Sequence, residues 1–218
     1  KKVVKPHKGV SIFNFHYCVP PETVAMNYGL GKVIGENETG FRGRHDFLYR
    51  SEGWDFLLAG GGLYNNLDYS FTPKHPDGTL RNYKSPGGGS PALRKQLRVL
   101  QEFLYGFDFV RMKPDNSTVK SISGGLSTRV LAKKGKAYAI YIRTALPKKP
   151  RKISDYLKDR LKATLVLDIP AGRYRCQWVD VKTGKIIQSE KLTHKGGQAT
   201  LKSPQFANDT ALRAVSMD

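Results

Sequence analysis

The chain has 218 residues, of which 39% are hydrophobic and 25% are charged. This composition is typical of a globular protein with a hydrophobic core and excludes an intrinsically disordered chain. The longest apolar runs, such as residues 54–61, are too short to span a bilayer. The basic start at Lys1 is not followed by an apolar segment, so we expect no signal peptide in this stretch.

The net charge is +19, from 37 Lys and Arg residues against 18 Asp and Glu residues. A positive field of this size attracts nucleic acids, anionic polysaccharides or membrane surfaces. The basic residues are scattered and are dense only at 133–136 and 148–152, which favours a solvated basic surface. An anionic polysaccharide is the first alternative. We expect no nucleic-acid partner, because no set of strands interleaves aromatic with basic residues.

Two cysteines, Cys18 and Cys176, lie far apart in the sequence without metal-ligand spacing around either. This pattern predicts two free, buried thiols and no disulfide or zinc site. We expect no metal and no cofactor.

The first half of the chain alternates short apolar strands with helical patterns, which predicts βα units. The elements expected, in chain order, are a strand at 10–17, a helical segment opened by the prolines at 20–23, a strand at 32–35, a helix N-capped by Asp46 and ending at Leu58, a strand at 63–71, and a helix that starts at Ser90-Pro91. The last helix has an apolar stripe at Leu93, Leu97, Leu100, Leu104 and Phe107.

Three βα units cannot close a barrel, which needs eight strands. The first half is therefore either a small open α/β layer or a piece of a longer domain, and we expect the second.

The pattern of apolar and polar residues changes near Asp115. After it, short segments alternate apolar and polar residues and are separated by turn signals. These segments are 127–131, 137–143, 163–169, 173–180, 185–192, 199–203 and 211–216, with one short polar helical stretch near 155–160. Short strands at such spacing predict an antiparallel β-sandwich.

In parallel α/β barrels the functional residues lie at the carboxyl ends of the strands. The ends of the three expected strands carry carboxylate, amide, imidazole and phenol groups beside aromatic rings, a mixture suited to binding sugars. The candidate residues are His16, Tyr17, Glu36, Glu38, Asn65, Asn66, Asp68 and Tyr69.

Two stretches of the sequence carry a family resemblance. Glu-Asn-Glu-Thr-Gly-Phe at 36–41, with 49–61 and 65–71, resembles cellulase-like and, more distantly, apiosidase-like glycoside hydrolases with a (β/α)8 barrel. Residues 167–184 resemble the C-terminal sandwich of such proteins, known as a putative collagen-binding domain. The resemblance implies the last three βα units of a TIM barrel at 1–115, a β-sandwich at 116–218, and a secreted or periplasmic location.

The resemblance also implies a catalytic nucleophile at the end of the penultimate barrel strand, on Glu38 or Glu36. We prefer Glu38, because the resembling proteins carry an acidic residue directly before Thr-Gly-Phe. Both residues share a strand parity, so both could face one side, with Glu36 binding substrate or tuning charge. Either could instead cap the next helix or pair with Arg42 or Arg44.

Retaining hydrolysis needs a second carboxyl group as acid/base, which in the resembling clan follows the fourth strand. We therefore expect a glycosidase as the longer parent and an inactive fragment in this chain. The other candidates have two readings each. His16 and Tyr17 either orient the nucleophile or bind a substrate hydroxyl, or they form a buried, hydrogen-bonded pair. Asp68 binds substrate or is structural, and Tyr69 is a sugar platform or a core residue. The alternative function is non-catalytic carbohydrate or matrix binding by a basic β-sandwich.

Overall fold

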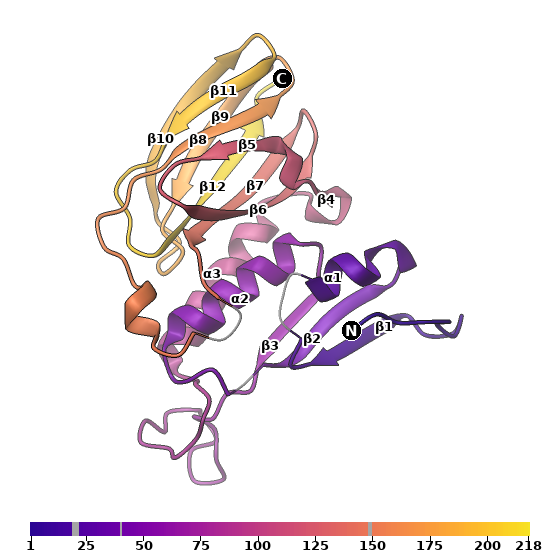
Figure 1. The fold of residues 1–218 in the computed structure, drawn as a ribbon, viewed down its shortest axis with the longest axis vertical. Coiled ribbons are helices and arrows are strands. Elements are labelled where there is room, and N and C mark those ends of the chain that lie inside the picture. The colour runs from indigo at the N-terminus through magenta and orange to yellow at the C-terminus, as the bar shows by residue number, and fades with distance from the viewer. Residues whose placement is uncertain (19–21, 40, 148–149) are drawn as a thin grey trace. The chain divides into compact units, whose positions relative to one another are not determined.

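The computed structural model describes residues 1–18, 22–39, 41–147 and 150–218. Pro20, Pro21 and the start of the basic run 148–152 lie outside these ranges. The chain divides into two compact units, Lys1–Arg98 and Val99–Asp218, which are described separately below (Figure 1). The boundary predicted from sequence, after residue 115, falls later in the chain and stays a prediction.

The first unit contains a parallel sheet of three strands in sequence order, β1-β2-β3. The strands are β1 Ile12–His16, β2 Val33–Thr39 and β3 Leu63–Asn66. The helices are α1 Glu22–Asn27, followed by a 3₁₀ turn at Tyr28–Leu30, then α2 Asp46–Leu58 and the start of α3 Pro91–Tyr105. The βα alternation predicted for this half is therefore present, with the strands parallel.

The helices cover one face of this sheet. Val24 of α1 and Phe56 of α2 are fully buried against Ile34 of β2, and Phe13 and Phe15 of β1 pack on the same cluster. On the other face the apolar side chains of Ile12, Val33 and Leu63 are 40–50% exposed. The two faces of the sheet thus differ, with a packed core on the helical side only.

The ends of three elements differ from prediction for identifiable reasons. Strand β2 continues through Thr39 rather than stopping at residue 35, because Glu36 and Glu38 remain paired with β1. Strand β3 stops at Asn66, since Asp68 accepts a hydrogen bond from the Ser70 amide in an Asx turn. Helix α2 is N-capped by His45, not Asp46: the His45 ring accepts from the Phe47 amide at 3.2 Å.

The second unit contains two antiparallel sheets. The larger has the order β10-β9-β12-β7-β6-β4 and the smaller the order β11-β8-β5. Their bounds are β4 Lys113–Pro114, β5 Val119–Ile122, β6 Leu126–Lys133, β7 Ala137–Thr144, β8 Thr164–Ile169, β9 Gly172–Val179, β10 Ile186–His194, β11 Gly197–Lys202 and β12 Asp209–Ser216. Short 3₁₀ turns occur at Phe109–Arg111, Asn116–Thr118 and Ile153–Tyr156.

Both sheets of the second unit contribute to one hydrophobic core. Trp178 and Tyr174 of β9 are buried with Leu165 and Leu167 of β8. Alternating residues of β6, β7, β8, β9, β11 and β12 lie in this core, as the sequence predicts for strands with one core-facing side, whereas β10 contributes only the partly buried Leu192. The strands that sequence analysis missed, β4 and β5, are short, and short strands carry little alternation to detect.

Both cysteines are buried free thiols, as predicted. None of the helices in the described ranges is both long and apolar enough to cross a membrane.

Candidate functional site

The carboxyl ends of β1 and β2 bring three of the predicted residues into contact. The Tyr17 hydroxyl donates a hydrogen bond to Glu38 Oε1. The other carboxylate oxygen, Glu38 Oε2, lies 3.4 Å from His16 Nδ1. The Glu38 side chain is 27% exposed and the His16 side chain 52% exposed, so this carboxylate is held by two neighbours and still reachable from solvent.

A register irregularity decides which acidic residue of β2 joins this group. Phe15 pairs with Glu36, but the next residue, His16, pairs with Glu38, so one residue of β2 is skipped. Successive residues of a strand face opposite sides, and paired residues face the same side. Glu36 therefore lies with Phe15 on the helix-covered face, and Glu38 lies with His16 on the open face. The expectation that both acids share one face fails because of this irregularity, a device that often re-aims side chains beside active sites.

Two aromatic residues at these strand ends have strained backbones. Tyr17 has φ +55° and Phe41 has φ +59°, in the left-handed region that residues with bulky side chains rarely occupy. Their rings stack with centroids 5.4 Å apart, and they are 46% and 56% exposed. Such strain persists where the surroundings impose it, and it clusters at functional sites. Phe41 was not among the predicted site residues, although it ends the Thr-Gly-Phe motif.

Glu36 is fully buried. Its Oε2 accepts a hydrogen bond from the Cys18 amide at 3.2 Å, while Oε1 has no hydrogen-bond partner among the described residues. Burial raises the pKa of Glu36 to about 8; the Cys18 amide opposes this shift and the negative charge of Glu52 adds to it. Glu36 is thus mostly protonated at neutral pH. Its predicted substrate-binding role stays a prediction.

A buried polar cluster around Glu52 of α2 supports the end of β2 and was not predicted from the sequence. Glu52 Oε2 accepts from the Thr39 hydroxyl at 2.6 Å and from the Tyr64 hydroxyl at 3.3 Å. Glu52 Oε1 lies 3.3 Å from the Arg42 guanidinium. Burial raises the pKa of Glu52, and Arg42 counters that effect. The cluster links β2, β3 and α2 around Thr39, the residue next to Glu38. Nothing in the local sequence marks Glu52, because its partners are distant in the chain.

The two asparagines at the end of β3 have different environments. Asn65 is exposed, and its Nδ2 donates to the backbone oxygen of Asn37 at 3.4 Å. Asn66 is buried and pairs in register with Thr39. Among the described residues its Nδ2 has no acceptor. Asn65 thus lies on the solvent-exposed side of the strand end, and Asn66 lies on the buried side.

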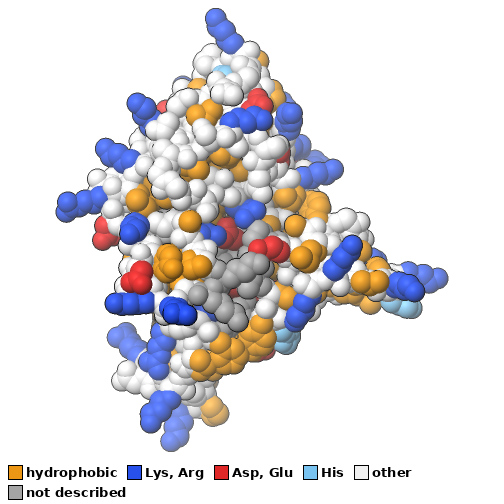
Figure 2. All heavy atoms as spheres, in the orientation of Figure 1, with side chains coloured by type: hydrophobic (Ala, Val, Ile, Leu, Met, Phe, Trp, Pro, Cys, Tyr) orange, Lys and Arg blue, Asp and Glu red, His pale blue; other side chains and the backbone are white. Residues whose placement is uncertain are grey.

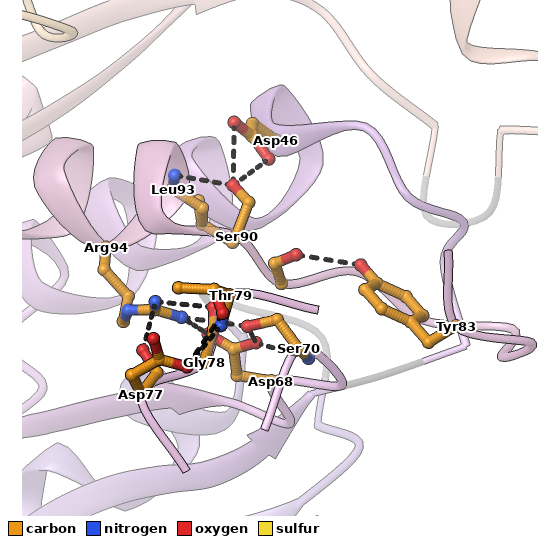
Figure 3. A network of polar contacts seen from close by, with 11 residues as sticks. Asp46, Asp68, Ser70, Asp77, Gly78, Thr79, Tyr83, Ser90, Leu93 and Arg94 are labelled. Carbon is orange, nitrogen blue, oxygen red and sulfur yellow. Dashed lines mark hydrogen bonds and ion pairs between the residues drawn. The ribbon is translucent and has the colours of Figure 1, made fainter. Parts of the chain in front are cut away.

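Asp68 belongs to a polar network that organises the loop before α3 (Figure 3). Asp68 Oδ2 pairs with Arg94 at 2.7 Å, and Asp68 Oδ1 accepts from the Ser70 hydroxyl at 2.5 Å. Arg94 also donates to the Gly78 backbone oxygen at 2.8 Å. The Tyr69 ring stacks on Tyr83, with centroids 6.2 Å apart. Both carboxylate oxygens of Asp68 thus have structural partners; substrate binding by Asp68 or Tyr69 stays a prediction.

No protein-family model and no curated protein matches the sequence. Solved structures do match the fold. One described as a glycoside hydrolase aligns with a TM-score of 0.57 and 16% identity over 85% of this chain and 43% of that chain. A family 5 glycoside hydrolase from Bacteroides vulgatus aligns with a TM-score of 0.55 and 15% identity, over 85% of this chain and 42% of that chain. A GH30 endoxylanase from Clostridium papyrosolvens aligns with a TM-score of 0.52 and 9% identity, over 94% of this chain and 49% of that chain.

These identities show a likeness of fold. The chain has a fold like that of glycoside hydrolases and spans less than half the length of each of these neighbours.

Proposed function

We propose that this chain is the C-terminal part of a retaining glycoside hydrolase, with Glu38 as its nucleophile. In this proposal β1, β2 and β3 are the last three strands of a (β/α)8 barrel, and the second unit is an accessory β-sandwich. The parallel order of the three strands and the shared core of the two antiparallel sheets support it. So does the coverage of less than half of the glycoside hydrolase neighbours, since three strands cannot close a barrel.

The observation that carries the proposal is the pair of contacts to the Glu38 carboxylate. Tyr17 donates to one oxygen and His16 lies beside the other. These neighbours restrict the rotation of the carboxylate and hold its oxygens in one orientation, as a nucleophile requires. The carboxylate is also partly exposed at the carboxyl end of a parallel strand, where barrel enzymes carry out their chemistry.

The proposed chemistry follows from a carboxylate that is held in one orientation. Glu38 attacks the anomeric carbon, the bond to the leaving oxygen breaks, and a covalent glycosyl ester forms on Glu38. A second carboxyl group, roughly 5–5.5 Å away, protonates the leaving oxygen and then removes a proton from the water that hydrolyses the ester. We propose that this acid/base follows the fourth strand of the parent barrel.

Glu36 does not compete for the nucleophile role in this scheme. It is fully buried on the helix-covered face, and its pKa of about 8 keeps it mostly neutral at pH 7. A neutral, buried carboxyl group can neither reach a sugar nor attack it. Its protonation also avoids placing a second negative charge in the strand next to Glu38.

The stacked rings of Tyr17 and Phe41 border Glu38 and are about half exposed. Aromatic faces pack against the apolar faces of sugar rings, so this pair is suited to hold the sugar whose bond is broken. The proposed substrate is therefore an oligosaccharide or polysaccharide, and the proposed location of the enzyme is secreted or periplasmic.

The test uses the full-length parent protein. Glu38→Gln keeps the shape of the side chain but removes the nucleophile, so turnover of the best substrate should fall about 10⁴-fold or more. Treatment with 2,4-dinitrophenyl 2-deoxy-2-fluoro-glycosides of glucose, xylose and mannose should label the peptide that contains Glu38, as seen by mass spectrometry. Glu102→Gln, an exposed substitution on α3, is the matched control and should leave turnover unchanged. Undiminished turnover in Glu38→Gln, or a label on another carboxylate, would remove Glu38 from this role.

A further inference from the structure

The second unit has a pocket of about 380 Å³ that is separate from the Glu38 site. Strands β9 and β12 and the residue after β12 form it. Its lining residues are Arg175, Gln177, Arg213, Val215, Ser216 and Met217. The size falls within the range of small-ligand sites.

The alternation of β9 and β12 explains why arginines line this pocket. Tyr174, Cys176 and Trp178 point into the core, so Arg175 and Gln177 between them point to the outer face of the sheet. Leu212 and Ala214 of β12 are core residues as well, which sends Arg213 and Val215 outward. In register, Arg213 lies opposite Gln177 and Val215 opposite Arg175, so the two arginines are diagonal neighbours.

The positive charge in this pocket is not neutralised within the described residues. Neither Arg175 nor Arg213 forms an ion pair there, and no lining residue is acidic. Lys191 of β10 lies opposite Arg175 in register and adds a third cation. The carboxylate of Asp218 lies near this edge but is held by Arg173, at 2.9 Å from its Nε. Arg175 lowers the pKa of Arg213, second to burial, as expected for two cations without an anion between them.

Arg213 is also held in place. Its guanidinium donates to the Gly106 backbone oxygen and lies over the Phe107 ring, 4.9 Å from the centroid. The Arg213 side chain is thus fixed, whereas the exposed Arg175 on the neighbouring strand is free to move onto a ligand. A preformed cation beside an adaptable one lowers the entropy lost on binding.

We propose that this pocket binds the sulfate or carboxylate groups of an anionic polysaccharide. Planar guanidinium groups bind both anions through paired N–H donors. Gln177 offers an amide group for the sugar hydroxyls. A nucleic acid fits less well, because none of the lining residues is aromatic and so none can stack on a base.

The pocket is a local feature and not a consequence of the net charge. On the face drawn in Figure 2, Lys and Arg side chains lie at many separate points and do not gather into one patch. A scattered field attracts polyanions loosely and without dependence on any one residue. The proposal instead requires that binding depend on Arg175 more than on an arginine elsewhere.

The experiment measures binding of a heparin-derived hexasaccharide to the whole 218-residue chain by isothermal titration calorimetry near 0.15 M salt. Arg175→Gln should weaken binding about tenfold or more, because it removes a charge-assisted pair of hydrogen bonds. Arg151→Gln removes the same charge from another exposed position and should weaken binding less than about threefold. Arg175→Lys keeps the charge but loses the planar fork, so its loss should be intermediate.

Further ligands distinguish the chemistry. Oligogalacturonate should bind and lose affinity in Arg175→Gln, whereas neutral cellohexaose should show no dependence on Arg175. Equal losses in Arg175→Gln and Arg151→Gln would overturn the proposal in favour of a diffuse field. So would a short DNA duplex that binds as tightly as the hexasaccharide and loses affinity in the same variant. These results do not depend on Glu38, so the pocket and the glycosidase proposal can fail independently.

Discussion

The two units bury different kinds of side chain. In the described part of the first unit, charged residues are buried beside the sheet: Glu36, Arg50, Glu52 and Asp55. In the second unit, the described residues that fill the space between the sheets are aliphatic and aromatic, with Trp178, Tyr174 and Tyr138 the largest.

This difference in buried side chains separates the positioning of site residues from the stabilisation of the fold. Burying a charged group costs free energy unless it is paired and hydrogen-bonded, so such groups persist where they position something else. Glu52 holds Thr39 and Tyr64 around the end of β2, next to Glu38. Among the described residues of the second unit one charged residue, Asp209, is buried, where it accepts from the Tyr141 hydroxyl at 2.7 Å, and this unit gains most of its stability from an apolar core.

The largest expected effect is on the stability of the second unit. Trp178→Ala removes a fully buried indole and leaves a cavity in the core that the two sheets share, which should cost about 3–5 kcal/mol of unfolding free energy. Urea unfolding followed by circular dichroism measures this loss. Trp178→Phe keeps most of the packing and should cost clearly less. If both variants unfold like the wild type, the apolar core is not what stabilises this unit.

The next effect concerns Glu36 and the pH dependence of the first unit. Its pKa is raised from 4.5 to about 8 in the folded state, so its contribution to stability is full below pH 4.5 and is lost as pH rises through about 8. Unfolding free energy should therefore fall by about 3 kcal/mol between pH 5 and pH 8 through this group. Glu36→Gln should remove that fall.

Chemical denaturation at several pH values compares the two proteins, with Glu190→Gln in β10 as the control that retains the wild-type slope. A slope in Glu36→Gln equal to the wild-type slope would show that Glu36 ionises normally. The difference between the two units would then rest on the burial and contacts of their charged residues and not on a shifted pKa.

The smallest expected effect is at Tyr17. Tyr17→Phe removes only the hydroxyl that donates to Glu38, so in the full-length parent turnover should fall about 10- to 100-fold while the unfolding free energy changes by less than about 1 kcal/mol. The stacking of this ring on Phe41 is retained. Steady-state kinetics measures the expected loss of turnover, and urea unfolding of the same preparation measures the change in unfolding free energy. A loss of stability without a loss of turnover would assign Tyr17 to the structure of the strand end.

The sequence alone determined the elements whose signals are local. Helix α3 starts at Pro91 as predicted, since a proline at the first helical turn and an apolar stripe are readable within fifteen residues. Strands β6 to β12 lie within one or two residues of their predicted bounds, because alternating apolar residues of most of them face the shared core and turn signals separate them in the sequence. The candidate residues His16, Tyr17 and Glu38 were also readable as polar groups at strand ends.

Only the tertiary structure separated the two acidic residues of β2. Glu36 and Glu38 are two residues apart and look equivalent in the sequence, where strand parity places them on one face. The skipped residue in the pairing of β1 with β2 turns them to opposite faces. That register depends on how a distant strand packs, and so does the bond from Tyr17, twenty-one residues earlier in the chain. Pairing partners are chosen by the folded core and not by local propensity, which is why the sequence left this choice open.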